Sequence, residues 1–349
     1  MAVEKINTEQ LLAAAGKYPV IDVRSPAEFE QAHIPGAVSL PLFSNEERKI
    51  VGTSYKQQSR ETAIKIVLDF FGPKMRSMVE LAEQLNSKTV IVHCWRGGMR
   101  SAAVAWLLDL YGFKVFTLAG GYKKFRHFVI NQFSKLYNFN IIGGYTGSGK
   151  TELIQVLEQR GQTIIDLEAL ASHKGSAFGN LGMPVQPSQE HFENLLGMAL
   201  YNINMQNNAE QIIWLEDESQ RIGTINLPMP FWKQMRTAPL YFIDIPFEQR
   251  LNNICSWYGQ QDAQKIIEAI IRIQKRLGGL ETKTAVQFMQ EGNSKECFRI
   301  LLKYYDKYYN KSLQNRPNTD AVMNRITLPA VDAANNCQAV LNYALQKQL

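Results

Sequence analysis

The sequence predicts an α/β protein with two parallel-sheet domains, the second of which is extended by a helical C-terminal region. Strand and helix signals alternate twice along the chain, which is typical of parallel sheets with crossover helices. Two loops of unusual composition, one with a cysteine and one rich in glycine, each follow an apolar strand and precede a helix. The length of 349 residues suits two domains better than one.

The first domain is predicted over residues 8–134. An apolar strand is expected at 19–23, and it leads into a helix that Ser25 caps and Pro26 begins. The remaining elements continue the alternation: a turn and strand at 33–42, helices at 60–71 and 75–86, a β-branched strand at 89–93, a buried helix at 102–112, and a strand and turn at 114–121.

The second domain is predicted over residues 135–349, after a boundary in the basic amphipathic segment 120–138. Each of its strands is apolar and is followed by a loop and a helix; they are expected at 139–142, 163–166, 211–216 and 240–245. The last hundred residues are predicted to be mostly helical, with strong helical spacing in 262–277.

The composition indicates a reducing cytoplasmic location without a membrane span. No apolar stretch reaches the roughly 18 residues that a span requires, and residues 1–20 lack an export signal. The four cysteines are widely spaced, unlike those of a disulfide framework or a C-x-x-C metal site. We therefore expect Cys94 to be available as a thiol. No oligomeric state is predicted.

The net charge of +6 is unevenly distributed. Residues 1–138 carry 18 basic and 12 acidic side chains, whereas residues 139–349 carry 20 of each. Within the second part, the segment 299–316 is locally basic. Such a segment can attract a polyanion, although a solvated helix face is the commoner reason for it.

The segment HCWRGGMRS (93–101) has the features of a reactive cysteine loop. A strand would deliver Cys94 into a loop whose amides and following helix favour the thiolate. Arg100 could hold a tetrahedral oxyanion above the sulfur, and Ser101 fits the helix N-cap. The alternative is a buried structural cysteine. The residues between Cys94 and Arg100 that would shape the loop include Trp95, Arg96, Gly97 and Gly98.

This loop, taken with VIDVRSPAEFEQAHIPGAVSLP (20–41) and FTLAGGYKKF (116–125), resembles a rhodanese domain, the sulfurtransferase fold that carries sulfur as a cysteine persulfide. The resemblance implies that Cys94 is the nucleophile and that Asp22 and Arg24 frame its loop. The loop from Cys94 to Arg100 has seven residues, as in rhodanese-like phosphatases, where many rhodaneses have six. The wider loop suggests a bulkier group, such as a phosphate ester or a selenium species.

The segment GYTGSGKT (144–151) satisfies the phosphate-loop pattern G-x-x-x-x-G-K-[ST] after an apolar strand. Its glycines would expose amides to a di- or triphosphate, Lys150 would reach the outer phosphate oxygens, and Thr151 would ligate Mg²⁺ if this ion is used. The predicted phosphate-binding residues are Gly144, Gly147, Ser148, Gly149, Lys150 and Thr151.

Four acidic residues are candidates for acid or Mg²⁺ chemistry beside this loop. Asp166 ends one predicted strand, and Glu216, Asp217 and Glu218 stand at the end of another. They suit a nucleotide-bound Mg²⁺, a diphosphate-bound Mg²⁺, or simply a polar strand end. No motif for adenine or guanine recognition is apparent. The segment 171–179, with His173 and Lys174, is either a functional loop over the site or an ordinary surface loop.

Candidate nucleic-acid contacts occur in three places. In 299–311 basic residues recur every fourth position and alternate with tyrosines, a mixture suited to phosphate contact and base stacking. The alternative is a helix that packs its tyrosines onto the core. Trp95 could shield its loop or stack on a base. The candidates are Lys123, Lys124, Arg126, His173, Lys174, Arg299, Lys303, Lys307 and Lys311.

The succession HCWRGGMRS, GGYTGSGKTEL, ASHKGSAFG and EDESQRIG resembles the family of tRNA 2-selenouridine synthases over nearly the whole chain. The resemblance implies a tRNA-modifying enzyme that replaces the sulfur of a wobble 2-thiouridine by selenium. It also implies two substrates, geranyl diphosphate and selenophosphate, and an S-geranylated intermediate. The phosphate loop would hold the prenyl diphosphate, and Cys94 would carry or direct the selenium.

Two other functions are compatible with the same motifs. The first is a small-molecule kinase with a regulatory rhodanese module, whose triphosphate turnover would need neither RNA nor Cys94. The second is a non-catalytic tRNA-binding sulfur carrier, which would bind tRNA without changing its nucleosides.

Overall fold

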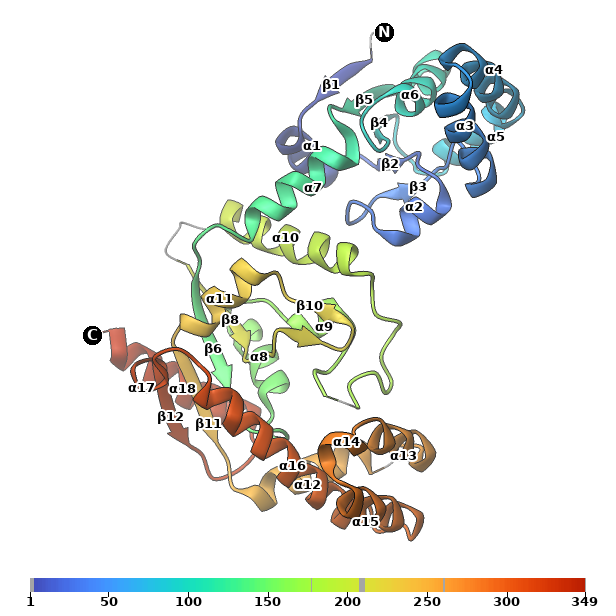
Figure 1. Ribbon diagram of the computed structural model, residues 1–349. Coiled ribbons are helices and arrows are strands. Elements are labelled where there is room, and N and C mark those ends of the chain that lie inside the picture. The colour runs from blue at the N-terminus through green and yellow to red at the C-terminus, as the bar shows by residue number, and fades with distance from the viewer. Residues whose placement is uncertain (1–2, 177, 207–210, 260, 349) are drawn as a thin grey trace. The chain divides into compact units, whose positions relative to one another are not determined.

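The computed structural model describes residues 3–176, 178–206, 211–259 and 261–348. The chain divides into two compact units (Figure 1). The first comprises Met1–Gln132 with Glu190–Met198, and the second comprises Phe133–Gln189 with Ala199–Leu349. Position 177, within the loop expected at 171–179, lies outside the described residues.

The first unit contains a five-stranded parallel sheet in the order β1-β5-β4-β2-β3. Its central strands are short and almost fully buried, as expected when helices cover a parallel sheet. The edge strand β1 was not predicted. The strands are β1 (Glu4–Ile6), β2 (Val20–Asp22), β3 (Val38–Ser39), β4 (Thr89–His93) and β5 (Lys114–Leu118).

The helices of the first unit confirm the predicted alternation and add two helices that were not predicted, α1 and α3. The helix expected at 60–71 is α4 (Arg60–Phe71), and the one expected at 75–86 ends earlier, at Glu83. The other helices are α1 (Thr8–Ala15), α2 (Pro26–Gln31), α3 (Asn45–Gln57), the 3₁₀ turn η1 (Gly72–Lys74), α5 (Met75–Glu83), α6 (Met99–Tyr111) and α7 (Gly121–Gln132); residues 190–198 belong to α10 (Gln189–Gln206).

The second unit contains another five-stranded parallel sheet, in the order β12-β11-β6-β8-β7. The strand β6 lies between β11 and β8, so the loop that follows it opens at the centre of the sheet's carboxyl edge. The strands are β6 (Asn138–Gly143), β7 (Thr163–Ile164), β8 (Ile212–Glu216), β11 (Leu240–Asp244) and β12 (Met323–Thr327); β9 (Arg221–Ile222) and β10 (Ile225–Asn226) form a separate antiparallel pair.

The C-terminal part of the second unit is mostly helical, as predicted, with two differences. The strand β12 interrupts it and completes the edge of the sheet. The helix expected at 262–277 is divided at Ile273 into α13 and α14. The helices of this unit are α8 (Lys150–Gln159), α9 (Leu167–Ala171), α11 (Met229–Thr237), α12 (Phe247–Tyr258), α13 (Ala263–Arg272), α14 (Gln274–Leu277), α15 (Gly279–Gln290), α16 (Ser294–Gln314), α17 (Thr319–Val322) and α18 (Ala333–Gln348).

Each unit has its own apolar core, and the second unit has two. One core of the second unit packs α8 and α18 against the sheet through residues such as Leu153, Leu157 and Val340. The other lies among helices α12 to α16, with Ile266, Phe298 and other apolar side chains at its centre. The helical extension is thus a packed subdomain. Among the described residues, no helix is both long and apolar enough to cross a membrane.

The packing of the core against the second sheet predicts how a substitution there changes the free energy of unfolding. Leu157 is fully buried between α8 and the sheet, so Leu157→Ala should lower the free energy of unfolding by about 2–5 kcal/mol. Urea unfolding of the full chain, followed by circular dichroism, measures this change. Leu136→Ala, at a side chain that is 90% exposed, is the control and should be nearly neutral. Equal effects of the two substitutions would contradict this description of the core.

Candidate active sites

The first candidate site is the cysteine loop between β4 and α6. Cys94 is 3% exposed, and its Sγ lies 3.3 Å from Ser101 Oγ and accepts a hydrogen bond from the Gly98 amide at 3.4 Å. The prediction that Ser101 caps the helix is wrong, because Gly98 occupies the cap position. Ser101 instead lies in the first helical turn, where its hydroxyl is 3.0 Å from the Gly98 carbonyl oxygen and 3.3 Å from the Cys94 sulfur. Its single proton can be donated to either atom, and donation to the sulfur stabilises the thiolate.

These contacts favour the thiolate form of Cys94. Burial alone would raise the pKa of the thiol. The Ser101 hydroxyl and the backbone amides of the loop outweigh burial, and together they hold the pKa below its ordinary value. A lowered pKa is the property that makes a cysteine nucleophilic near neutral pH.

The start of α7 fixes the shape of this loop. The amides of Tyr122 and Lys123 donate to the carbonyls of Cys94 and Trp95, each at 2.9 Å. Gly121 has a φ of +59°, and a Cβ at this position would lie 2.3 Å from the Cys94 carbonyl oxygen. A side chain at Gly121 would therefore displace the loop that carries the nucleophile.

Asp22 and Arg24 form a buried ion pair behind the loop. The Arg24 guanidinium donates to Asp22 at 2.6 Å and to the Ala32 carbonyl at 2.7 Å. It also lies 3.9 Å from the centre of the Tyr122 ring, against which Trp95 packs with ring centres 5.6 Å apart. The ion pair thus packs against the ring of Tyr122, and the Tyr122 amide in turn donates to the Cys94 carbonyl.

Arg100 is engaged by a carboxylate of the same unit. Its guanidinium donates to Glu28 at 2.7 Å. Burial would raise the pKa of Glu28, but the Arg100 hydrogen bond and charge hold it below its usual range. In this structure Arg100 therefore orders the loop, and an oxyanion above Cys94 would have to compete with Glu28 for the guanidinium.

The second candidate site is the phosphate loop between β6 and α8. Gly149 has a φ of +78° and forms the N-cap of α8, so the amides at the start of that helix face the loop. The Lys150 ammonium donates to the Gly144 carbonyl across the loop at 3.1 Å. Ser148 is buried, with a hydroxyl that has no hydrogen-bond partner among the described residues. Gly147 also lines the pocket described below.

Three glutamates converge beside this loop, and one of them was not predicted. Oxygens of Glu168, Glu216 and Glu218 lie within 4.8 Å of one another. Glu168 follows the short strand β7 and approaches the Thr151 hydroxyl at 3.4 Å. Its place two residues after Asp166, beside the strand expected at 163–166, is the only signal that the sequence offered.

The other predicted acids have different partners. Asp166 caps helix α9 by accepting from the Ala169 amide at 2.8 Å. Asp217 is paired with Arg316 and accepts from the Tyr309 hydroxyl at 2.7 Å. Of the four acids predicted, Glu216 and Glu218 belong to the glutamate cluster.

Burial and mutual repulsion raise the pKa values of the clustered glutamates. The pKa of Glu168 rises to about 7, that of Glu216 rises to about 8, and that of Glu218 lies well above its ordinary value. One buried oxygen of Glu216 has no hydrogen-bond partner among the described residues. A hard divalent cation such as Mg²⁺ fits this set, because it would satisfy that oxygen and relieve the repulsion.

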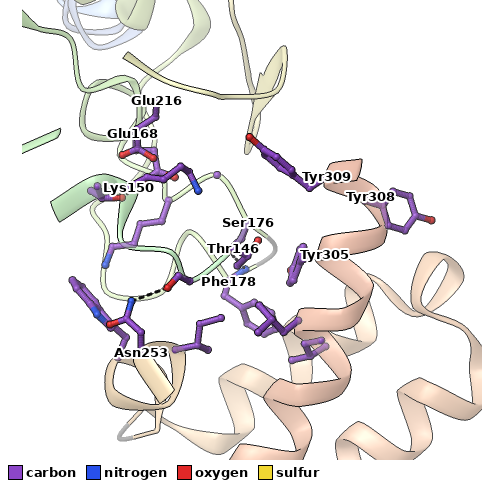
Figure 2. Close-up of a pocket in the computed structure, with 18 of the residues that line it drawn as sticks. Thr146, Lys150, Glu168, Ser176, Phe178, Glu216, Asn253, Tyr305, Tyr308 and Tyr309 are labelled. Atoms are coloured by element: carbon purple, nitrogen blue, oxygen red, sulfur yellow. Dashed lines mark hydrogen bonds between the residues drawn. The ribbon is translucent and has the colours of Figure 1, made fainter. Parts of the chain in front are cut away.

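A pocket of about 450 Å³ extends from the phosphate loop to helices α12 and α16 (Figure 2). In Figure 2, Lys150, Glu168 and Glu216 lie on one side and the tyrosines of α16 on the other. The polar end also includes Thr151, Glu218 and Lys174. The other end, called the apolar wall below, is lined mostly by apolar or aromatic side chains: Phe178, Ile254, Trp257, Tyr258, Phe298, Leu301, Leu302, Tyr304, Tyr305 and Tyr308. Three polar residues, Asn253 of α12, Arg276 of α14 and Ser312 of α16, also line the pocket.

The helices that carry this apolar wall also hold the phosphate loop. The buried Arg250 of α12 donates to the Thr146 carbonyl at 3.1 Å and forms two bonds to Asp306 of α16, at 2.9 and 2.8 Å. Asn253 donates to the Gly147 carbonyl at 3.0 Å. The Tyr309 hydroxyl accepts from the Gly144 amide at 3.2 Å. These side-chain hydrogen bonds could not be predicted from the sequence.

The segment predicted as a functional or ordinary loop at 171–179 lines the pocket. Lys174 lies 4.5 Å from the centre of the Trp257 ring, and His173 is buried. Gly175 has a φ of +61°, and a Cβ there would lie 2.8 Å from Glu168. The backbone of this loop therefore lies directly on the glutamate cluster.

The candidate tRNA contacts fall into two groups in the structure. The tyrosines of α16 line the pocket, and of these Tyr308 is also 41% exposed. Arg299 is paired with Glu248 and Glu296, and Arg126 is paired with Glu193 at 2.6 Å and donates to Asn194. The candidates with exposed side chains are Lys123, Lys124, Lys303, Lys307 and Lys311.

The two sites define a protein with a rhodanese-like unit and a phosphate-loop unit of the AAA type. The rhodanese-like domain model matches residues 7–127, and the model of the tRNA 2-selenouridine synthase AAA domain matches residues 137–328.

The chain belongs to the tRNA 2-selenouridine synthase family, as the resemblance predicted. It is similar to the tRNA 2-selenouridine synthase of Nitrosomonas europaea, with 40% identity over 72% of this chain and 67% of that protein. The proteins of the same name from Nitrosomonas eutropha and Bdellovibrio bacteriovorus are 34% and 32% identical to it, over 89% and 90% of this chain and 92% and 94% of theirs.

The contact between Ser101 and Cys94 predicts how the reactivity of the thiol depends on pH. Ser101→Ala removes the hydroxyl that favours the thiolate, so the pKa of Cys94 should rise. The rate of iodoacetamide alkylation at Cys94, mapped by mass spectrometry against pH, should shift its midpoint to higher pH. Ser77→Ala, on α5, is the control. An unchanged midpoint in Ser101→Ala would show that Ser101 does not tune the thiol.

Proposed function

We propose that this protein converts the 2-thiouridine at the wobble position of tRNA to 2-selenouridine in the cytoplasm. Its substrates besides tRNA would be geranyl diphosphate and selenophosphate, and the reaction would pass through an S-geranylated uridine. Family membership supports the tRNA-modifying activity. The observation that carries the choice of a prenyl diphosphate is the pocket with a phosphate loop at one end and an apolar wall at the other.

The apolar wall suits a hydrocarbon chain better than a nucleoside. Each CH₂ group that leaves water contributes about 0.8 kcal/mol, so a geranyl chain would gain several kcal/mol along this wall. A ribose and base would instead place polar groups beside Phe178, Leu301 and Leu302, where their hydrogen bonds to water would be lost. This contrast favours a prenyl donor over the kinase alternative.

The polar end would stabilise diphosphate as the leaving group. Lys150 and Lys174 place two cations in the pocket, and the amides at the start of α8 add hydrogen-bond donors. Glu168, Glu216 and Glu218 would hold Mg²⁺, and Thr151 lies beside Glu168. When bound, the ion would neutralise charge that develops on the diphosphate.

The first unit would serve the selenium step. Geranylation turns the sulfur at C2 of the uridine into a better leaving group, and the selenium nucleophile then displaces geranyl thiol. The Cys94 thiolate, favoured by Ser101 and the loop amides, would direct the selenium by attacking the phosphorus of selenophosphate. An S–P bond would form as the P–Se bond breaks, selenide would leave as the nucleophile for the uridine, and water would then hydrolyse the S–P bond to release phosphate and restore the thiol.

Nucleoside analysis tests the proposed function. tRNA from a deletion strain grown with selenium, and from the same strain complemented with the wild-type gene, is digested and analysed by mass spectrometry. We expect 2-selenouridine to be absent without the protein and restored by it. Unchanged 2-selenouridine in the deletion strain would contradict the proposal.

The two sites should act in different steps. Lys150→Ala should block S-geranylation, because the diphosphate loses its principal cation. Cys94→Ala should leave geranylation intact and abolish selenation, so that geranylated tRNA accumulates. Both products are measured by mass spectrometry of purified reactions. Loss of the same step in both variants would contradict this division of roles.

The apolar wall should contribute to the binding of the prenyl chain and not to the binding of the diphosphate group. Tyr305→Ala removes one aromatic side chain from the wall and should weaken geranyl diphosphate binding about tenfold, while inorganic diphosphate binds as before. Equilibrium binding of both compounds to the full chain measures this. Tyr55→Ala, an exposed position on α3, is the control. Equal weakening of both ligands would show that the wall does not hold the chain.

A further inference from the structure

A basic hollow, separate from the phosphate-loop pocket, lies beside the Cys94 loop in the first unit. It has a volume of about 470 Å³ and is lined by Arg96, Gly120, Lys123, Lys124 and His127. Arg96 belongs to the cysteine loop itself, and the other residues belong to the turn before α7 and its first two turns. The side chains of all four polar residues are exposed.

The basic side chains of this hollow differ from three nearby arginines in whether they have a carboxylate partner. Arg24, Arg100 and Arg126 each have a carboxylate partner within the first unit. In contrast, none of the described residues that line the hollow is acidic, and the sequence of α7 contains no acidic residue. Among the described residues, no ion pair involves Arg96, Lys123 or Lys124, so their charges are available to a ligand in solution.

The hollow is connected to the nucleophile by backbone hydrogen bonds. The Lys123 amide donates to the Trp95 carbonyl, and the preceding amide, that of Tyr122, donates to the Cys94 carbonyl. A ligand held by Lys123 and Arg96 would therefore lie next to the loop that carries the thiol. The hydrogen bonds between α7 and the loop fix the spacing between this ligand and Cys94.

We propose that this hollow binds the phosphate backbone of the tRNA substrate and holds the strand beside Cys94. Three features favour a nucleic-acid strand over a small free anion. The cations are exposed and spread over a loop and a helix face, no buried donor closes around a single anion, and the hollow is shallow enough to admit a polymer. The inference rests on the proposed function for the identity of the RNA.

Salt dependence of tRNA binding tests the proposal without requiring turnover. Filter binding of the full chain to an in vitro transcribed tRNA is measured over a range of KCl concentrations. Lys123→Ala/Lys124→Ala should weaken binding on the order of tenfold and reduce the slope of log K against log[salt] by about 2, because two phosphate contacts are lost. Lys56→Ala/Lys65→Ala removes the same charge from exposed positions on α3 and α4 and should leave both quantities unchanged.

Three outcomes would overturn the proposal. The first is unchanged affinity and slope in the Lys123/Lys124 variant. The second is an equal loss in the Lys56/Lys65 control, which would indicate a general effect of net charge. The third is a small-anion site: millimolar inorganic phosphate would slow alkylation of Cys94 in the wild type but not in the variant, while tRNA affinity stayed the same. Because binding is measured directly, failure of the selenation reaction would not affect this test.

Discussion

The second unit depends on one buried guanidinium, that of Arg250. It connects the end of β11, the phosphate loop and helix α16 by donating to the Ile245 carbonyl, the Thr146 carbonyl and Asp306. A buried arginine that lost its carboxylate partner would cost about 3–5 kcal/mol, so these segments are held together strongly. As a result the phosphate loop shares its pocket with the helical subdomain, and the pocket acquires an apolar wall.

In both candidate sites the surroundings shift the pKa of buried acidic groups, but in opposite directions. At Cys94, a hydroxyl and backbone amides surround a buried sulfur and favour its anion. At the glutamate cluster, burial and repulsion act against the anions and raise their pKa values. The first arrangement favours a nucleophile, whereas the second favours a bound cation, which in the proposed function would accompany the diphosphate. A reaction that first alkylates sulfur and then replaces it would use both.

Much of the fold could be predicted because its signals are local. Apolar β-branched runs indicated the central strands, and the glycine pattern indicated the phosphate loop. The strand β12 was not predicted, because its sequence MNRIT is half polar and its place in the sheet comes from pairing with β11. The positions of Ser101, Glu168 and Arg250 within the sites also depend on contacts between distant segments. The partners of Arg100 and Asp217 likewise became apparent only when Glu28 and Arg316 were placed beside them.

The central claim is that the phosphate-loop pocket recognises a prenyl chain together with its diphosphate. Isothermal titration of the full chain with geranyl diphosphate, inorganic diphosphate and ATP, each in the presence of Mg²⁺, tests it most directly. The account predicts that geranyl diphosphate binds at least about a hundredfold more tightly than inorganic diphosphate, since several CH₂ groups leave water. It also predicts a negative heat-capacity change for the geranyl compound. Binding of ATP as tight as that of geranyl diphosphate would contradict it.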